Sequence, residues 1–189
     1  EQGVFTVPLQ GEVKNPPVVT ILAAGGDAGS VMEALIDPQN SSTTVGFEYS
    51  TDPDVNGFDV TTLAGSSSGY AEGTGTDAQF SQPSGVVRDS AGNVFVADTL
   101  NHCIRKITRD GVSRIFAGAA GESGYVDGSP ENSRFNEPVG IVRRGDGVLF
   151  VSDSKNHRVR EISPTGNVST YAGSGEANFT DGVGSAARF

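Results

Sequence analysis

The stretch "FVADTLNH" runs from Phe95 to His102, and "FVSDSKNH" runs from Phe150 to His157, 55 positions further along the chain. A single stretch of this kind, with an aspartate, an asparagine and a histidine within five residues, could be an active site. Two copies at a fixed spacing favour a repeated structural unit, in which the octet forms the same corner twice.

The repeat extends well beyond the octet. Residues 80–118 align without a gap with residues 135–173, and 16 of the 39 aligned positions are identical. The segment that ends at Phe80, "GYAEGTGTDAQF", returns as "GYVDGSPENSRF" and once more as "NFTDGVGSAARF", which ends at Phe189. These residues therefore contain two full units and the connecting segment of a third.

Each unit predicts four short strands separated by turns. In the first unit, runs rich in Val, Ile and Phe predict strands at residues 84–89, 93–98, 102–109 and 112–117, with equivalents 55 positions later. "SAGN" and "RDG" separate three of these runs, and their glycines permit the positive φ of tight turns. A four-stranded antiparallel unit that recurs about every 40–55 residues is typical of a propeller blade. The sequence thus predicts an all-β fold.

The repeated motifs closely resemble a known family, the NHL repeat. They are "PSGVV", "VFVADT" and "NHCIRKI" in the first unit, and "EPVGIV" and "LFVSDSKNHRVREI" in the second. The connecting segments resemble those of bacterial extracellular NHL proteins. The resemblance covers residues 61–189 and implies NHL-type β-propeller blades at an extracellular or cell-surface location. Since such propellers have about six blades, two blades and a third begun would form an incomplete ring. We expect further blades of a longer chain, or copies that exchange strands, to complete it.

Residues 1–60 do not share the repeat. Residues 1–16 include the alternating run "GVFTVPLQGEV" and resemble the terminal strand and linker of an immunoglobulin-like module. Residues 17–60 resemble the opening strands of a fibronectin-type or related sandwich module. A complete module of this kind has about 100 residues, so we expect a partial immunoglobulin-like β-segment before the blades.

Composition and charge narrow the function classes. Residues 1–60 contain nine acidic residues and one basic residue (net −8), and residues 61–189 contain fourteen acidic and twelve basic residues (net −2). Neither part offers the basic face that phosphate binding requires, so no nucleic acid is expected as a partner. No stretch approaches the roughly 18 apolar residues of a membrane span, so membrane insertion is not expected.

The two histidines are the first candidates for a metal site. His102 and His157 are the only histidines in the chain, whereas a metal normally needs three or four ligands. Some propeller enzymes that resemble this family bind a metal through histidines of different blades, so recurrence alone leaves that alternative open. Because both histidines stand at the same position of the repeat, at the start of the third strand, we predict a structural role. Asp98 and Asp153 are predicted to be turn residues whose carboxylates accept backbone N–H bonds between strands.

A nucleophilic site has little support in the sequence. Cys103 is the single cysteine and cannot form an internal disulfide. It stands where the second unit has Arg158, a position that we expect to be exposed. "GSSSG" at residues 65–69 matches the nucleophile-elbow pattern only within a Gly/Ser-rich linker.

The stretch "DPDVNG" at residues 52–57 reproduces the first half of a calcium-binding EF-hand loop. Asp52, Asp54 and Asn56 occupy ligand positions, but Leu63 stands where the twelfth-position glutamate is needed. An acidic turn is therefore the favoured interpretation, and calcium binding stays open.

These residues lead to one expected function and two alternatives. We assign no catalytic residue, no cofactor-binding residue and no metal ligand. The expected function is a non-enzymatic extracellular or cell-surface binding or structural module, a β-propeller scaffold whose partner is another protein or further copies of itself in a homo-oligomer or filament. The alternative that the resemblance permits is a propeller enzyme of the lyase or lactonase type with its active site in other blades. An RNA-binding propeller is disfavoured because a basic face is absent.

Overall fold

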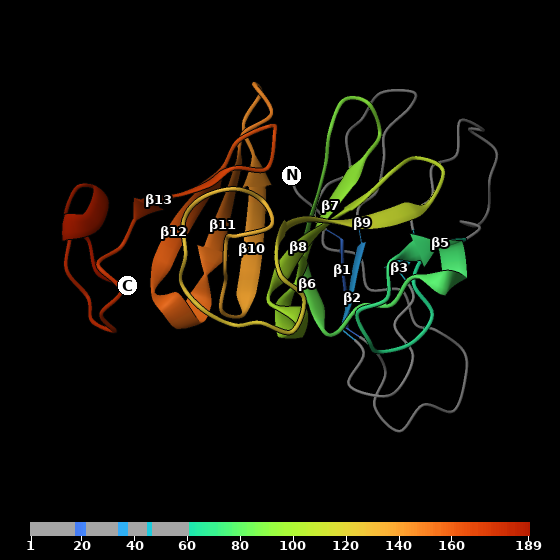
Figure 1. Ribbon diagram of the computed structural model, residues 1–189, viewed down its shortest axis with the longest axis horizontal. Coiled ribbons are helices and arrows are strands. Elements are labelled where there is room, and N and C mark those ends of the chain that lie inside the picture. Colours follow the sequence, from blue (N-terminus) through green and yellow to red (C-terminus); the bar gives the residue numbers. More distant parts are fainter. Residues whose placement is uncertain (1–17, 22–33, 38–44, 47–60) are drawn as a thin grey trace.

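The structure, a computed structural model, describes residues 61–189 and three short strands that precede them (Figure 1). These strands are β1 (Val18–Ile21), β2 (Ala34–Asp37) and β3 (Val45–Gly46). The predicted strand at residues 3–13 and the acidic turn at residues 52–57 lie outside the described residues. The immunoglobulin-like interpretation of the chain before residue 61 finds no support among the described residues and stays a prediction.

Two antiparallel sheets form the described body of the protein (Figure 1). Blade 1 consists of β6 (Pro83–Arg88), β7 (Val94–Asp98), β8 (Cys103–Ile107) and β9 (Val112–Gly118), with β5 (Gly73–Thr74) added at the β9 edge. Blade 2 consists of β10 (Pro138–Arg143), β11 (Leu149–Asp153), β12 (Arg158–Ile162) and β13 (Val168–Ala172). Strands that are consecutive within a blade pair with each other, so the predicted all-β fold and its four-stranded units are confirmed.

The helical residues among those described are confined to four short 3₁₀ turns, at η1 (Gly75–Asp77), η2 (Thr99–Asn101), η3 (Ser154–Asn156) and η4 (Gly184–Ala186). Within the described part of the chain, no helix has the length and apolar character needed to span a membrane.

The turn between β6 and β7 is built from local polar contacts. Oδ1 of Asp89 accepts hydrogen bonds from the N–H groups of Ala91 (2.9 Å) and Asn93 (2.8 Å). Gly92 takes a φ of 89°, which a residue with a Cβ rarely adopts. The stretch "SAGN" therefore reverses the chain where the sequence predicted a turn.

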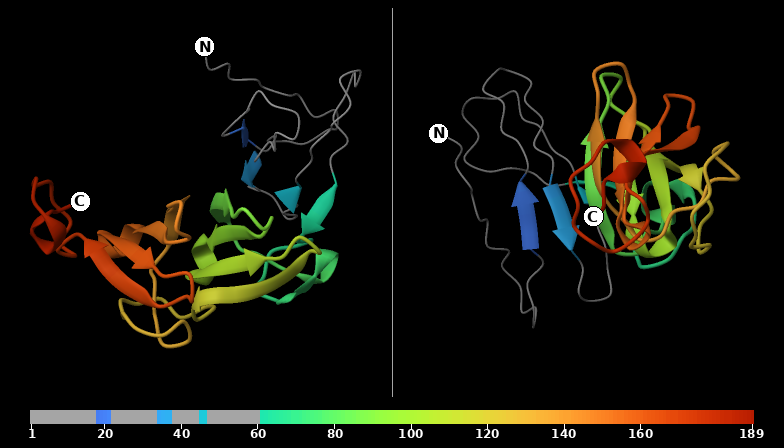
Figure 2. Two further views of the ribbon diagram at one scale, coloured as in Figure 1. Left: turned by 90° about the horizontal axis from the view of Figure 1, so that it is seen from above. Right: turned by 90° about the vertical axis from the view of Figure 1, so that its left-hand side faces the viewer.

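The main hydrophobic core lies between the two blades. Phe95 and Ile104 of blade 1 pack in one cluster with Phe135, Leu149 and Val151 of the second unit. The two sheets stand next to each other along the long axis of the molecule, as Figure 2 shows in its left-hand view. Every residue of β7 is buried, because each face of blade 1 is covered.

The opposite face of blade 1 carries a second core. Val86, Val96 and Ile107 pack there with Phe80 and with Ala64, which ends the short strand β4 (Thr62–Ala64). β4 pairs with β3, and β2 lies beside β6. Blade 1 is therefore sandwiched between blade 2 and the strands that precede it.

Where β6 meets β10, the backbones approach closely. A Cβ on Gly85 would overlap the carbonyl oxygen of Val139, so the position requires glycine. The hydroxyl of Ser84 donates to that same oxygen (3.0 Å), and Thr99 Oγ1 donates to the carbonyl oxygen of Pro138 (2.8 Å). These contacts set the distance between the two blades at their β6–β10 side.

The connecting segments recur in the structure three times. They are linker 1 (residues 65–80), linker 2 (residues 118–135) and linker 3 (residues 173–189). The first glycine of each donates its N–H to a carbonyl 10–12 residues later: Gly65 to Gly75 (3.0 Å), Gly118 to Pro130 (2.9 Å) and Gly173 to Gly184 (3.1 Å). The glycine at the end of β4 therefore makes the same linker hydrogen bond as the glycines at the ends of β9 and β13. This identifies residues 62–64 as the counterpart of a blade's last strand.

Candidate functional site

Asp98, the last residue of β7, is the centre of a buried polar cluster in blade 1. Its Oδ1 accepts a hydrogen bond from the backbone N–H of Ser81 (2.7 Å). Its Oδ2 accepts from Asn101 Nδ2 (2.8 Å) and from Arg105 Nη1 (3.2 Å). The carboxylate thus accepts a backbone N–H as expected, but from the residue after linker 1 and not from the connection between the strands.

Arg105 and Asn101 extend this cluster into linker 1. Arg105 donates from Nη1 to the carbonyl oxygen of Gln79 (3.1 Å) and from Nη2 to that of Ala71 (3.0 Å). Asn101 Nδ2 donates to the carbonyl oxygen of Gly69 (2.6 Å). The guanidinium also lies 4.8 Å from the centre of the Phe80 ring. Two side chains of blade 1 therefore hold three linker carbonyls, and we call this arrangement the clasp.

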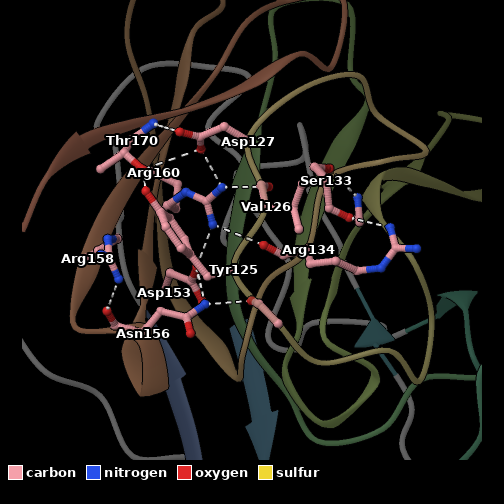
Figure 3. A network of polar contacts seen from close by, with 12 residues as sticks. Tyr125, Val126, Asp127, Ser133, Arg134, Asp153, Asn156, Arg158, Arg160 and Thr170 are labelled. Carbon is pink, nitrogen blue, oxygen red and sulfur yellow. Dashed lines mark hydrogen bonds and ion pairs between the residues drawn. The ribbon is translucent and has the colours of Figure 1, made fainter. Parts of the chain in front are cut away.

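Blade 2 repeats the clasp with equivalent residues (Figure 3). Arg160 Nη1 donates to Asp153 Oδ2 (2.7 Å) and to the carbonyl oxygen of Arg134 (3.0 Å), and Nη2 donates to that of Val126 (2.9 Å). Asn156 completes the clasp on linker 2. Its Nδ2 donates hydrogen bonds to the carbonyl oxygen of Gly124 (2.7 Å) and to Asp153 Oδ2 (2.8 Å).

The second clasp contains an additional carboxylate. Arg160 Nη2 donates a hydrogen bond of 2.6 Å to Asp127 Oδ1. In the first clasp, the equivalent Arg105 Nη2 donates to the hydroxyl of Ser113 instead (2.9 Å). Asp127 also accepts from the backbone N–H of Thr170 on β13 (3.1 Å). Linker 2 is consequently tied to both β12 and β13 through a single side chain.

Burial determines the electrostatics of both clasps. Removal from water raises the pKa of Asp98 to about 6, although the bonds from Asn101, the Ser81 N–H and Arg105 favour the ionised form. Burial likewise raises the pKa of Asp153. Within the described residues, Nε of Arg105 and of Arg160 is buried without a hydrogen-bond partner. The side chains of both ion pairs are fully buried, so these carboxylates have no access to a dissolved substrate.

The two histidines are placed at blade corners, one residue before the third strand of each blade. His102 and His157 take left-handed backbone conformations, with φ of 55° and 50°. Nδ1 of His102 accepts a hydrogen bond from the backbone N–H of Glu137 in the next unit (3.1 Å). The structure therefore does not bring the two imidazoles to one site. Among the described residues, no group of three or more His, Cys, Asp or Glu side chains could hold a metal ion.

Cys103 is buried, and the expectation that this position is exposed is wrong. It follows His102 directly as the first residue of β8, is fully buried, and pairs with Gly118 at the end of β9. Burial raises the pKa of its thiol, which keeps it protonated and unreactive at neutral pH. The equivalent Arg158 is half-buried and lies with its guanidinium 3.8 Å from the centre of the Tyr125 ring.

The remaining predicted positions are not brought to either clasp. Asp52, Asp54 and Asn56 lie outside the described residues, while Leu63 is half-buried against the second core. The "GSSSG" stretch at residues 65–69 opens linker 1, where the next element is the short strand β5 and not an α-helix, so it is not a nucleophile elbow.

Sequence reasoning missed a set of exposed aromatic side chains on the linkers. They occupy one equivalent position in each linker, and their exposed fractions are 65% for Tyr70, 44% for Tyr125 and 84% for Phe179. The signal was present in the three aligned segments, "GYAEG", "GYVDG" and "NFTDG". Alignment alone does not reveal whether an aromatic residue is exposed. Phe80 and Phe135 are also aromatic and aligned with each other, yet both are buried.

Comparison with known proteins agrees with this architecture. Residues 80–107 match the NHL repeat. NHL repeat-containing protein 2 of Bos taurus is 34% identical over 113 residues, covering 53% of this chain and 16% of that protein. Protein SUPPRESSOR OF QUENCHING 1, chloroplastic, of Arabidopsis thaliana is 29% identical over 94 residues, covering 50% of this chain and 9% of that protein. The chain thus spans less than a fifth of the length of these curated relatives.

Solved structures from Bacteroides share the fold. A structural genomics protein of unknown function from Bacteroides thetaiotaomicron aligns with a TM-score of 0.62 and 24% identity, over 84% of this chain and 37% of that one. An auxiliary nutrient binding protein from the same organism aligns with a TM-score of 0.58 and 24% identity, over 74% of this chain and 35% of that one. The chain therefore contains a match to the NHL repeat at residues 80–107, and its β-propeller-like blades share the fold of these Bacteroides proteins.

Proposed function

We propose that this protein is a non-enzymatic binding or structural module outside the cell or at a bacterial cell surface, whose blades present a surface for protein–protein interaction. The polar residues that recur in both units support this proposal through their contacts. Asp98, Asn101 and Arg105 are buried and bind linker 1 or its adjoining residue, so their role is to hold the blade together. A general acid or base has to reach the proton that it transfers, and these groups face the protein interior.

The observation that carries the proposal is the recurrence of an exposed aromatic side chain on all three linkers. Tyr70, Tyr125 and Phe179 are at the same repeat position and face solvent. Aromatic residues and arginine are enriched among the anchors of protein interfaces. Tyr125 also has Arg158 stacked on its ring, which combines both types of anchor at one position (Figure 3). We call these three side chains the linker aromatics.

Site-specific photo-cross-linking in the producing cells tests this role. A photo-reactive phenylalanine analogue at Tyr70 is expected to give a discrete adduct with one partner protein or with a second copy of the chain. Asp146 lies in the exposed turn before β11 and provides a matched control that should give none. Equal labelling at both positions, or no adduct at Tyr70, would count against the linker aromatics as a contact surface.

The enzyme alternative and the location have their own tests. Metal analysis of the purified protein is expected to find no stoichiometric divalent cation, whereas a bound cation would favour a lyase-type or lactonase-type activity. Cell fractionation is expected to place the native protein at the surface or in the medium. Recovery in the cytoplasm would contradict the proposed location.

A further inference from the structure

We propose that Tyr70 is the ring of an arginine-binding site on linker 1, which takes the guanidinium of an arginine side chain of the protein partner where the second unit supplies its own Arg158. The site rests on the proposed function, because it specifies the chemical group that the partner contributes at one of the linker aromatics. The surroundings of Tyr125, at the equivalent repeat position, show how such a site is built.

In the second unit, the chain itself supplies the guanidinium (Figure 3). Arg158 places this group 3.8 Å from the centre of the Tyr125 ring. Its Nη1 donates to the carbonyl oxygen of Asn156 (3.0 Å), and its Nη2 donates to that of Ser174 (2.7 Å). A Cβ on Gly175 would overlap the guanidinium, so the group fills the space between this glycine and the ring. Such stacking is favourable because the face of the ring attracts a planar cation.

In the first unit, the same repeat position has no arginine. Cys103 stands in place of Arg158, and its buried thiol is too short to replace a guanidinium on the neighbouring ring. Among the described residues, no arginine or lysine stacks on Tyr70. The exposed fraction of this side chain is accordingly 65%, against 44% for Tyr125. The first unit therefore presents the ring without the cation.

Space for a guanidinium is present beside Gly121. The repeated pair Gly-Glu aligns Gly121 with Gly175, and both glycines take a left-handed conformation, with φ of 79° and 88°. A Cβ on Gly121 would meet no atom within 4 Å, whereas one on Gly175 would overlap Arg158. The space that Arg158 occupies in the second unit is therefore open in the first.

Asn101 joins the two sides of this site. Its Nδ2 donates to the carbonyl oxygen of Gly69 (2.6 Å), the residue directly before Tyr70. Its own carbonyl oxygen accepts the N–H of Gly121 (3.0 Å), and a carbonyl oxygen has a second lone pair. The equivalent carbonyl of the second unit accepts from Arg158. An arriving guanidinium thus finds an aromatic ring and a hydrogen-bond acceptor together.

Two further properties favour an arginine from outside the chain. The Tyr125 hydroxyl lies 2.9 Å from Thr170 Oγ1, whereas Ile115, at the position of Thr170, offers Tyr70 no such partner. The net charge of −10 attracts a cationic partner. Arginine matches the site better than lysine, because a guanidinium is planar and more weakly hydrated than an ammonium group.

NMR of the protein with 13C-labelled tyrosine rings tests the site, with N-acetyl-arginine amide as the probe. Two control probes are N-acetyl-citrulline amide, which has a similar shape without the charge, and N-acetyl-lysine amide. At rising concentration, we expect the arginine probe to move the Tyr70 resonance at least about threefold further than either control probe does. The Tyr125 resonance is the internal control, because Arg158 already lies on that ring.

Two exchanges between the units sharpen the test. Cys103→Arg should supply the guanidinium from within the chain and abolish the response of Tyr70 to the probe. Arg158→Cys should open the equivalent site, so that the Tyr125 resonance begins to respond. The second variant keeps the test conclusive if the first does not fold, because it replaces a half-buried side chain with a smaller one.

Three results would overturn the proposal. Tyr70 could fail to respond, or it could respond equally to the arginine probe and to a control probe, and the ring would then not select a guanidinium. Tyr70 could also respond as strongly in Cys103→Arg as in the native protein, so that the open space would not be the binding position.

These failures are distinguishable from a failure of the proposed function. A Tyr70 that ignores the arginine probe while the photo-reactive analogue at this position still gives a discrete adduct would refute the arginine site alone. A Tyr70 that responds to the probe while no adduct forms in the cells would refute the contact with a protein partner and leave the arginine-binding chemistry in place.

Discussion

Arg105 forms a buried ion pair with Asp98, with 3.2 Å between Nη1 and Oδ2, and the same guanidinium binds the carbonyls of Ala71 and Gln79. One side chain on β8 therefore ties its neighbour β7 to a linker 26–34 residues earlier in the chain. Since Arg160 and Asp153 repeat this relationship, the clasp is the polar element that defines each unit of the fold.

Replacing the clasp arginine should strongly destabilise the protein. Arg105→Gln leaves Asp98 buried without its countercharge and frees the linker carbonyls, so we expect a loss of about 3–5 kcal/mol in the free energy of unfolding. Arg114→Gln is the matched control, because Arg114 forms an exposed pair with Glu72 and should cost less than about 1 kcal/mol. Urea unfolding measures both changes. Equal losses in the two variants would show that the clasp contributes little.

The buried carboxyl of Asp98 should give stability a specific dependence on pH. Its pKa is raised by burial from 3.8 to about 6 in the folded protein and returns towards 3.8 on unfolding. The folded state therefore binds this proton more tightly, and the resulting stability is fully present below about pH 4 and lost as the pH rises through about 6.

Comparison with Asp98→Asn isolates this effect. The free energy of unfolding of the native protein, relative to that of the variant, should decrease by about 2–3 kcal/mol between pH 4 and pH 7. Because Asp153 is present in both proteins, its own titration cancels in the difference. A difference that is constant across this range would mean that the pKa of Asp98 is not raised.

Gly85→Ala should disturb the contact between the blades. The new methyl group would meet the carbonyl oxygen of Val139 on β10, and backbone atoms cannot yield as a flexible side chain can. We expect a loss of about 1–3 kcal/mol. Gly145→Ala serves as the control, since its Cβ would meet open space. Thermal unfolding measures the stability of both variants. A Gly85→Ala variant that is as stable as the native protein would show that the blades can move apart at no cost.

The two histidines should differ in their contribution to stability. His102→Ala removes the acceptor of the Glu137 N–H, for which we expect a cost of about 1–2 kcal/mol beyond the backbone strain of alanine at positive φ. His157→Ala introduces the same strain and removes no hydrogen bond within the described residues. The difference between the variants in chemical denaturation therefore measures the bond between the blades. Stoichiometric zinc binding that either variant abolishes would contradict a structural role.

The sequence by itself determined the repeat, its all-β character and the approximate bounds of the strands. The reason is that these properties depend on local patterns, namely alternating Val, Ile and Phe residues and turn residues such as Gly92. The corner position of His102 and His157 followed from the same periodicity, with an error of one residue, because β8 and β12 begin after the histidine.

Only the tertiary structure decided which repeated residues act together. Arg105 and its linker carbonyls are far apart in the sequence, so no local pattern pairs them. Cys103 and Arg158 occupy the same repeat position but differ in burial, since β8 packs against Phe135 while β12 faces Tyr125 and solvent. Likewise, Val87 and Val142 are identical in the alignment, and one is covered while the other is exposed. Burial depends on which sheet stands opposite, and that is a property of the assembled blades.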